Sequence, residues 1–208
     1  MELKSNNDNT AISCKVILVG DSGVGKTSII NRYLNQYTDF QKATIGASYA
    51  SKLETIDNYK INFDIGDTAG QERFRSVNTI FYKEAYVCIM VYDITSLESF
   101  ESIKNYWYNT VKENSFDDII FGIAGNKIDL YEEEKVDQKV VNEYCKSIDA
   151  LFKTTSAKQN TCIDDIFAEL GKRFIKSDLF KFLLSQNVEK KQLNLDNNKK
   201  KNKKKKFC

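Results

Sequence analysis

The most informative segment of the sequence is Val16-Ile-Leu-Val-Gly-Asp-Ser-Gly-Val-Gly-Lys-Thr27. Residues 16–19 have the composition of a buried parallel strand, and residues 26–33 are compatible with a helix, so a Gly-rich segment joins the two. Its glycines let the backbone curl until successive N–H groups point at phosphate oxygens, and the following helix start adds partial positive charge. The segment therefore predicts a loop that binds the phosphates of a nucleotide.

Two residues of this GxxxxGK[ST] motif have specific expected tasks. Lys26 would bridge the terminal phosphates, and Thr27 would place its hydroxyl on Mg²⁺. The expected nucleotide-binding residues of the loop are Asp21, Ser22, Gly23, Val24, Gly25, Lys26, Thr27 and Ser28. A Gly-rich turn without a ligand is the competing interpretation, and the strand before it and the helix after it make that less favoured. The motif alone leaves kinases, ATPases and GTPases open.

Apolar runs alternate with amphipathic stretches along the chain, as in βα units around a largely parallel sheet. Strands are predicted over residues 14–19, 47–56, 60–65, 86–92, 119–124 and 151–155. Helices are predicted over residues 26–33, 96–113, 137–148 and 162–184. The second and third strands are too close in sequence for a helical crossover, so they should form an antiparallel hairpin. The expected fold class is α/β, a six-stranded, mostly parallel sheet with one antiparallel strand, flanked by helices.

The chain of 208 residues has the length of one domain with a tail. We expect a flexible N-terminus over residues 1–12, a folded domain over 13–184 and a disordered polybasic tail over 185–208. The net charge of +2 hides an asymmetry, because residues 189–208 hold nine lysines against two acidic residues. Such a basic end points to an anionic surface, either membrane or nucleic acid. With no signal peptide and no apolar run of membrane-spanning length, the expected compartment is the cytosol.

Histidine is absent from the sequence, and the five cysteines show no CxxC spacing. Zinc and disulfide sites are therefore disfavoured, and Cys14 and Cys88, which lie in or beside apolar runs, are expected to be buried thiols. Any catalysis must rely on positioning, carboxylates, amides or a metal.

A second motif, Gly125-Asn126-Lys127-Ile128-Asp129, follows the strand of residues 119–124 and indicates which base is bound. The carboxylate of Asp129 can accept hydrogen bonds from the N1–H and amino group of guanine, whereas adenine offers no such donor pair. Thr155-Ser156-Ala157-Lys158 follows the last strand, where a backbone N–H can meet guanine O6. A turn or helix-capping aspartate is the alternative for Asp129 alone, and the order of the motifs argues against it.

Taken in order, GDSGVGKT, KATIG, DTAGQE, GNKID and TSAK resemble the nucleotide-binding motifs of the Ras-like small GTPases, over residues 13–177. DTAGQERFRS, VYDIT and Ser99-Phe100 resemble the Rab branch, and TIGASY with IAGNKIDL resembles its early-endosomal subgroup. The resemblance implies a Ras-like P-loop GTPase fold with GTP or GDP and Mg²⁺ as cofactors. It also implies slow GTP hydrolysis that an activating protein accelerates, and a role in vesicle traffic through effectors that bind the GTP state.

The resemblance assigns roles to further residues. Thr44 would reach Mg²⁺ and the γ-phosphate, Gly70 would donate its N–H to that phosphate, and Gln71 would orient the attacking water. The implied catalytic residues are Gln71, Thr44 and Lys26; the metal-binding residues are Thr27, Thr44 and Asp67, the last through a water; and the residues around the base are Tyr37, Asn126, Lys127, Asp129, Ser156, Ala157 and Lys158.

Two positions depart from the family pattern. Gly66 stands where the family typically has tryptophan, so the aromatic triad for effectors would read Tyr49, Gly66 and Tyr82, and the effector surface must differ. Ser22 stands where some relatives have glycine, and we expect no loss of hydrolysis from it.

The C-terminal Cys208 follows a run in which residues 199–206 include seven lysines. We expect a prenyl group on Cys208, although the end matches neither paired cysteines nor a CaaX box. A nuclear address and a nucleic-acid tail are alternatives that the terminal cysteine disfavours. The resemblance implies a monomer on the cytoplasmic face of an endomembrane, with an exchange factor, a GTPase-activating protein, Rab escort protein, GDI and effectors as partners, and no nucleic acid. A non-hydrolysing scaffold and an ATP-using P-loop kinase remain as other functions.

Overall fold

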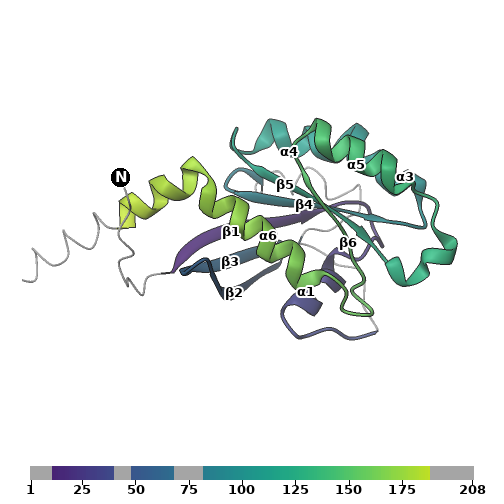
Figure 1. Cartoon of the computed structure of the whole chain (residues 1–208), viewed down its shortest axis with the longest axis horizontal. Coiled ribbons are helices and arrows are strands. Elements are labelled where there is room, and N and C mark those ends of the chain that lie inside the picture. Colours follow the sequence, from purple (N-terminus) through teal and green to yellow (C-terminus); the bar gives the residue numbers. More distant parts are fainter. Residues whose placement is uncertain (1–10, 40–47, 68–81, 188–208) are drawn as a thin grey trace, which may run out of the picture.

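The computed structural model describes residues 11–39, 48–67 and 82–187 (Figure 1). Four residues with an expected role, Thr44, Gly70, Gln71 and Cys208, lie outside these ranges, as does residue 47 at the expected start of a strand.

The core of the fold is a six-stranded sheet with the order β2-β3-β1-β4-β5-β6. Its strands are β1 (Ile12–Val19), β2 (Ser48–Ile56), β3 (Tyr59–Asp67), β4 (Val87–Asp93), β5 (Ile120–Asn126) and β6 (Leu151–Thr154). Strands β2 and β3 pair antiparallel, from Ile56 opposite Tyr59 to Ser48 opposite Asp67, and the other neighbours in this sheet are parallel. The α/β class and the single antiparallel strand of the sheet are confirmed.

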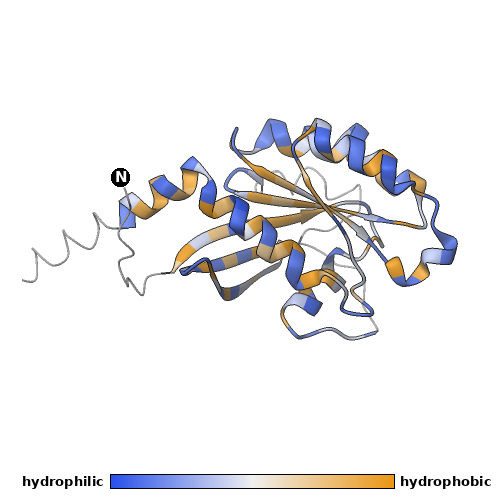
Figure 2. Ribbon diagram, viewed as in Figure 1, coloured by the Kyte–Doolittle hydropathy of each residue, from blue (hydrophilic) through white to orange (hydrophobic). Residues whose placement is uncertain are grey.

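Helices cover the sheet on both faces (Figure 1). They are α1 (Lys26–Tyr33), α3 (Leu97–Ser102), the π-helix η2 (Ile103–Trp107), α4 (Tyr108–Asn114), the 3₁₀ helix η3 (Ile128–Glu133), α5 (Gln138–Ser147) and α6 (Ile163–Lys176). Strand β1 shows the division by its period of two: Cys14, Val16 and Leu18 enter the core under α1 and α6, whereas Ile17 and Val19 enter the core under α3 to α5. Figure 2 shows the result, with apolar strands inside and hydrophilic helix surfaces outside.

Every residue of the central strand β4 is buried, which agrees with its unbroken apolar run. Cys14 and Cys88 are buried, as expected. Within the described ranges, no helix combines the length and the apolar character needed to cross a membrane.

Several element boundaries differ from the prediction. Strand β1 begins at Ile12, within the segment expected to be a flexible N-terminus, and β3 continues to Asp67 because β1 pairs with it that far. The short helix η3 was not predicted. It begins immediately after β5, because Lys127 adopts the left-handed region at φ 68° and turns the chain there.

The helix expected over residues 162–184 is interrupted at Ser177. Its hydroxyl donates to Phe174 O (2.7 Å) and accepts from Phe180 N–H (3.2 Å), so it ends α6 and caps a second helical segment over residues 178–187. Residues 185–187, assigned to the tail, therefore continue this second segment. The helix expected over residues 96–113 also contains a π turn, in which Tyr108 N–H donates to Ile103 O.

Candidate functional site

The loop between β1 and α1 needs glycine at two positions. Gly20 has φ 142° and a Cβ there would lie 2.2 Å from Val91 O, while Gly25 has φ 101° and a Cβ would lie 2.3 Å from Asn126 Nδ2. Both the backbone angle and the close approach exclude a larger side chain. The loop is thereby packed against the ends of β4 and β5.

Lys26 begins α1 and turns its side chain into the curve of the loop. Its Nζ donates to Gly20 O and Asp21 O, both at 2.8 Å, and the residue is only 5% exposed. Burial lowers the pKa of Lys26 to about 8, against the opposing attraction of Asp67 and Asp21. The ammonium is held inside the loop, where the motif places the terminal phosphates.

Thr27 and Asp67 meet from α1 and the end of β3. The Thr27 hydroxyl donates to Asp67 Oδ2 (2.7 Å), and Asp67 is 4% exposed. A hydroxyl and a carboxylate are oxygen ligands of the kind Mg²⁺ takes, and this ion commonly uses one or two protein groups with phosphates and waters. Among the residues that the structure describes, no group of three or more His, Cys, Asp or Glu side chains is placed to hold a metal ion.

Asn126, the last residue of β5, connects the motifs. Its side chain is buried, Nδ2 donates to Val24 O in the phosphate loop (2.9 Å), and Oδ1 accepts from Thr155 Oγ1 (3.2 Å) and Ala157 N–H (3.3 Å). One amide therefore joins the phosphate loop to the segment after β6.

Asp129 and Lys127 extend from the same strand end. Ser156 Oγ donates to Asp129 Oδ1 (2.5 Å), so the carboxylate is positioned by the segment after β6. Lys127, expected among the residues around the base, places its Nζ 2.6 Å from Asp93 Oδ2 at the end of β4. Burial alone would raise the pKa of Asp93, but hydrogen bonds from Lys127 and Thr95 outweigh it, and the pKa is lowered.

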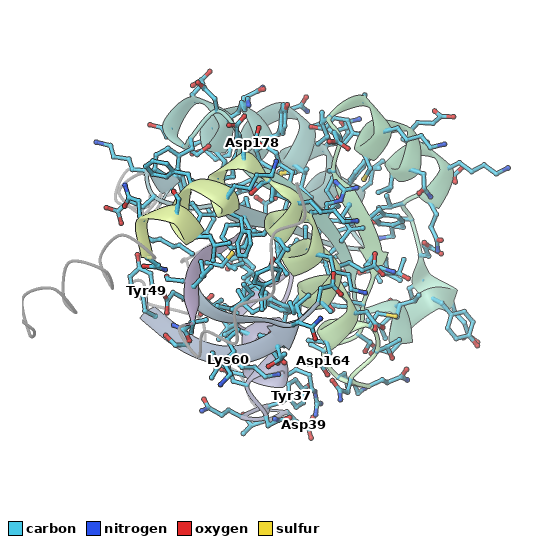
Figure 3. All side chains as sticks on the ribbon, turned by 60° about the vertical axis from the view of Figure 1, so that its left-hand side comes forward. Tyr37, Asp39, Tyr49, Lys60, Asp164 and Asp178 are labelled. Carbon is cyan, nitrogen blue, oxygen red and sulfur yellow. The ribbon has the colours of Figure 1, made fainter. Side chains whose placement is uncertain are left out.

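Arg32 is a site residue that the sequence did not reveal. It donates from Nε to Ala157 O (2.7 Å) and from Nη2 to Lys158 O (2.8 Å), and its guanidinium stacks 3.7 Å from the centroid of the Tyr37 ring. Figure 3 shows Tyr37 beside Asp39, just beyond α1. The two carbonyl partners lie more than a hundred positions away along the chain, so no local pattern could have indicated the contact.

The parallel strands β1, β3, β4, β5 and β6 end at one edge of the sheet, and the described site residues gather there. The contacts above link Asp21, Val24, Gly25, Lys26, Thr27, Asp67, Asn126, Asp129, Ser156, Ala157 and Lys158, and Arg32 adds Tyr37. Ser22 and Gly23 lie in the loop, and Ser28 lies in the first turn of α1.

The three positions expected to form the aromatic triad differ in their exposure. Tyr49 is 53% exposed and pairs across the hairpin with Gly66, whereas Tyr82 is fully buried. A Cβ at Gly66 would lie 3.4 Å from Tyr49 Cε1, so the ring covers the space next to the glycine.

A mixed sheet of this order, with a GxxxxGK[ST] loop after its first strand and Asn126 and Asp129 at the end of its fifth, defines a P-loop protein of the Ras-like GTPase class. Comparison with known proteins agrees with this class. The Ras family model matches residues 15–176. Human Ras-related protein Rab-21 is 40% identical over 168 residues, covering 80% of this chain and 74% of the relative. Ras-related protein Rab5 of Nicotiana tabacum is 38% identical over 163 residues, covering 78% and 81%.

A third relative, Ras-related protein RABF2a of Arabidopsis thaliana, is 36% identical over 170 residues, covering 81% of this chain and 84% of the relative. The chain therefore belongs to the Ras family, in its Rab branch of small GTPases.

Proposed function

We propose that this protein is a guanine-nucleotide switch that hydrolyses GTP and regulates vesicle membrane traffic by recruiting effectors in its GTP state. The observation that carries the proposal is the contact of Asn126 with Val24 and Ala157, because it connects the phosphate loop to the segment after β6 that would bind the base. The carboxylate of Asp129, positioned by Ser156, would then accept the two N–H groups that distinguish guanine from adenine.

In the proposed reaction, the chain positions the phosphates and stabilises their charge. The loop N–H groups of residues 21–28 and the Lys26 ammonium would hold the phosphates, and Tyr37 would pack against the base. Gln71 would orient the attacking water, while Thr44 and Gly70 would sense the γ-phosphate. All three lie outside the described residues and enter the proposal from the sequence.

Mg²⁺ would be held by the hydroxyls of Thr27 and Thr44, and by Asp67 through a water. When bound, it neutralises charge on the terminal phosphates. The 2.7 Å contact between Thr27 and Asp67 supports this assignment for the two described residues.

The proposal includes a membrane. A prenyl group on Cys208 together with the lysines of residues 199–206 would give the two signals that stable anchoring needs, on the cytoplasmic face of an endomembrane. Relatives named Rab5 and Rab-21 support an endosomal membrane. Escort protein and GDI would carry the lipidated chain, and an exchange factor and an activating protein would set its state. Mass spectrometry of the membrane-bound protein tests this, and a free thiol at Cys208 would refute lipidation.

Competition binding tests the nucleotide assignment. A fluorescent GDP analogue loaded with Mg²⁺ should be displaced by GTP or GDP and not by a large excess of ATP. Displacement by ATP would support the kinase alternative and contradict the role given to Asp129.

The non-hydrolysing scaffold is favoured by one observation, the glycine at position 66 immediately before the second switch motif. Glycine weakens a strand and gives the adjoining backbone more freedom. Tight GTP binding without turnover, even with an activating extract, would identify the scaffold.

A further inference from the structure

Trp107 contacts the phosphate loop from a distant part of the chain. Its Nε1–H donates to Asp21 Oδ1 (2.9 Å) across 86 positions of sequence, and the indole is fully buried among the side chains under α3 to α5. A hydrogen bond to a carboxylate is stronger than one between neutral groups. Through Trp107, the buried face of the helix therefore holds the side chain of Asp21 in the phosphate loop.

The contact lies at a local irregularity of the helix. Trp107 is the last residue of the π-helix η2, where Tyr108 N–H reaches back five residues to Ile103 O. Single π turns inside α-helices are uncommon and occur frequently at functional sites. Segment η2 packs directly on β4, whose Val91 carbonyl abuts Gly20 of the loop. Trp107 at the π turn thus contacts Asp21, and Val91 of β4 contacts the neighbouring Gly20.

Asp21 is held at two atoms from two sides. Its side chain accepts from Trp107, and its backbone carbonyl accepts from the Lys26 ammonium (2.8 Å). Gly20 before it is fixed by its left-handed φ of 142° and by the approach to Val91. The position of the Asp21 peptide therefore depends on the helix as well as on the loop.

We propose that Trp107 is a positioning residue for the bound nucleotide: through Asp21 it fixes the start of the phosphate loop and lengthens the residence time of the guanine nucleotide. The proposal rests on the nucleotide-binding function proposed above. A purely structural tryptophan, buried for packing and satisfied by a convenient acceptor, is the competing explanation. The two explanations differ in whether Asp21 and Trp107 act as one unit.

A double-mutant cycle on release of a fluorescent GDP analogue in Mg²⁺ buffer separates them. Trp107→Phe keeps an aromatic ring and removes the donor, and Asp21→Ala removes the acceptor without disturbing the core. We expect each to speed release about tenfold, as for loss of a charged hydrogen bond, and the double variant to be no faster than the faster single one. Val111→Ala is the matched control, since Val111 is buried in the same core on α4. It should lower stability and leave release within about twofold of wild type.

The tryptophan also provides a direct signal, because it is the only one in the sequence. Its emission should change when the nucleotide leaves and should lose that change in Asp21→Ala, which tests the link even if Trp107→Phe does not fold. The proposal would be overturned if the acceleration in the double variant equalled the product of the accelerations in the two single variants, or if the emission change were unaltered in Asp21→Ala. Either result would leave the nucleotide function intact. A wild-type chain that binds no guanine nucleotide would overturn both.

Discussion

Lys127 Nζ lies 2.6 Å from Asp93 Oδ2. Asp93 ends β4 and pairs in the sheet with Asn126, the last residue of β5, and Lys127 directly follows Asn126. The side chain of Asp93 is 13% exposed and also accepts from Thr95 N–H and Oγ1 (2.9 and 2.8 Å). The pair thus stiffens the strand end that carries the proposed base-binding residues.

Asp93→Asn should lower the free energy of unfolding by about 1 kcal/mol at neutral pH, because it removes the charge and can keep the contacts with Thr95. The pKa of Asp93 is lowered in the folded chain, so its contribution is present above the unfolded-state pKa and is lost as the pH falls through the folded-state pKa. Urea unfolding at fixed GDP should show the difference at pH 7 and its decline below about pH 4.

The control for this pair is Asp178→Asn. Asp178 and Lys181 are also 2.6 Å apart, but their side chains are 90% and 63% exposed (Figure 3 labels Asp178), so little change is expected. An equal difference between Asp93→Asn and wild type at both pH values would contradict the assigned ion pair.

Asn126→Ala should be severely destabilising. The substitution leaves Val24 O, the Thr155 hydroxyl and Ala157 N–H without this partner in a buried place, at a cost of about 2–4 kcal/mol. Thermal unfolding and GDP affinity should fall together. Asn142→Ala removes a comparable amide contact, to Gln138 O (2.7 Å), on an exposed face and should change stability by less than about 0.5 kcal/mol. Similar effects of the two substitutions would refute the connecting role of Asn126.

Arg32→Lys should accelerate GDP release about tenfold, because an ammonium cannot reproduce the two-pronged contact with Ala157 O and Lys158 O or the stacking on Tyr37. Arg173→Lys is the matched control, since Arg173 donates to the carbonyl of Asp149 (2.9 Å), away from the site. Stopped-flow release of a fluorescent GDP analogue measures both. Equal rates for Arg32→Lys and wild type would show that the segment after β6 is held without this arginine.

Gly66→Ala should stabilise the fold by about 0.5–1 kcal/mol, because a Cβ there meets Tyr49 Cε1 at 3.4 Å and Ile17 Cγ2 at 3.6 Å, while the unfolded chain loses freedom. Gly122→Ala, in β5, should instead destabilise by about 1–3 kcal/mol, because its Cβ would lie 2.9 Å from Leu170 Cδ1 in a packed core. Thermal melting of the two variants at equal GDP concentration tests the contrast. A loss of stability in Gly66→Ala would mean that the glycine is needed for the strand itself.

The sheet was predictable because its strands are short apolar runs and because the loop between β2 and β3 is too short for a crossover. The meeting of the motifs at one edge of the sheet was also predictable, because each motif follows a strand and parallel strands bring their carboxyl ends to the same edge. The ends of the strands were predicted less accurately. The polar Asp67, Asp93 and Asn126 belong to strands whose apolar runs stop earlier, since pairing with a neighbour holds these residues in register.

The contacts of Arg32, Asp93 and Trp107 could not be predicted, because each joins segments that are far apart in sequence. The π turn before Trp107 was also hidden, since residues 96–113 have an ordinary helical pattern. Ser177 interrupts the last helix through hydrogen bonds of its own side chain. A serine within a helical pattern does not always make such bonds, so the sequence did not predict the interruption.

Single-turnover hydrolysis of GTP by the purified protein with Mg²⁺, beside a Gln71→Leu variant and with ATP as competitor, tests the proposed switch most directly. Turnover on the order of 10⁻⁴ s⁻¹, lost in Gln71→Leu and unaffected by ATP, is the expected result. Tight GTP binding without turnover, alone or with an activating extract, or inhibition by ATP, would contradict it.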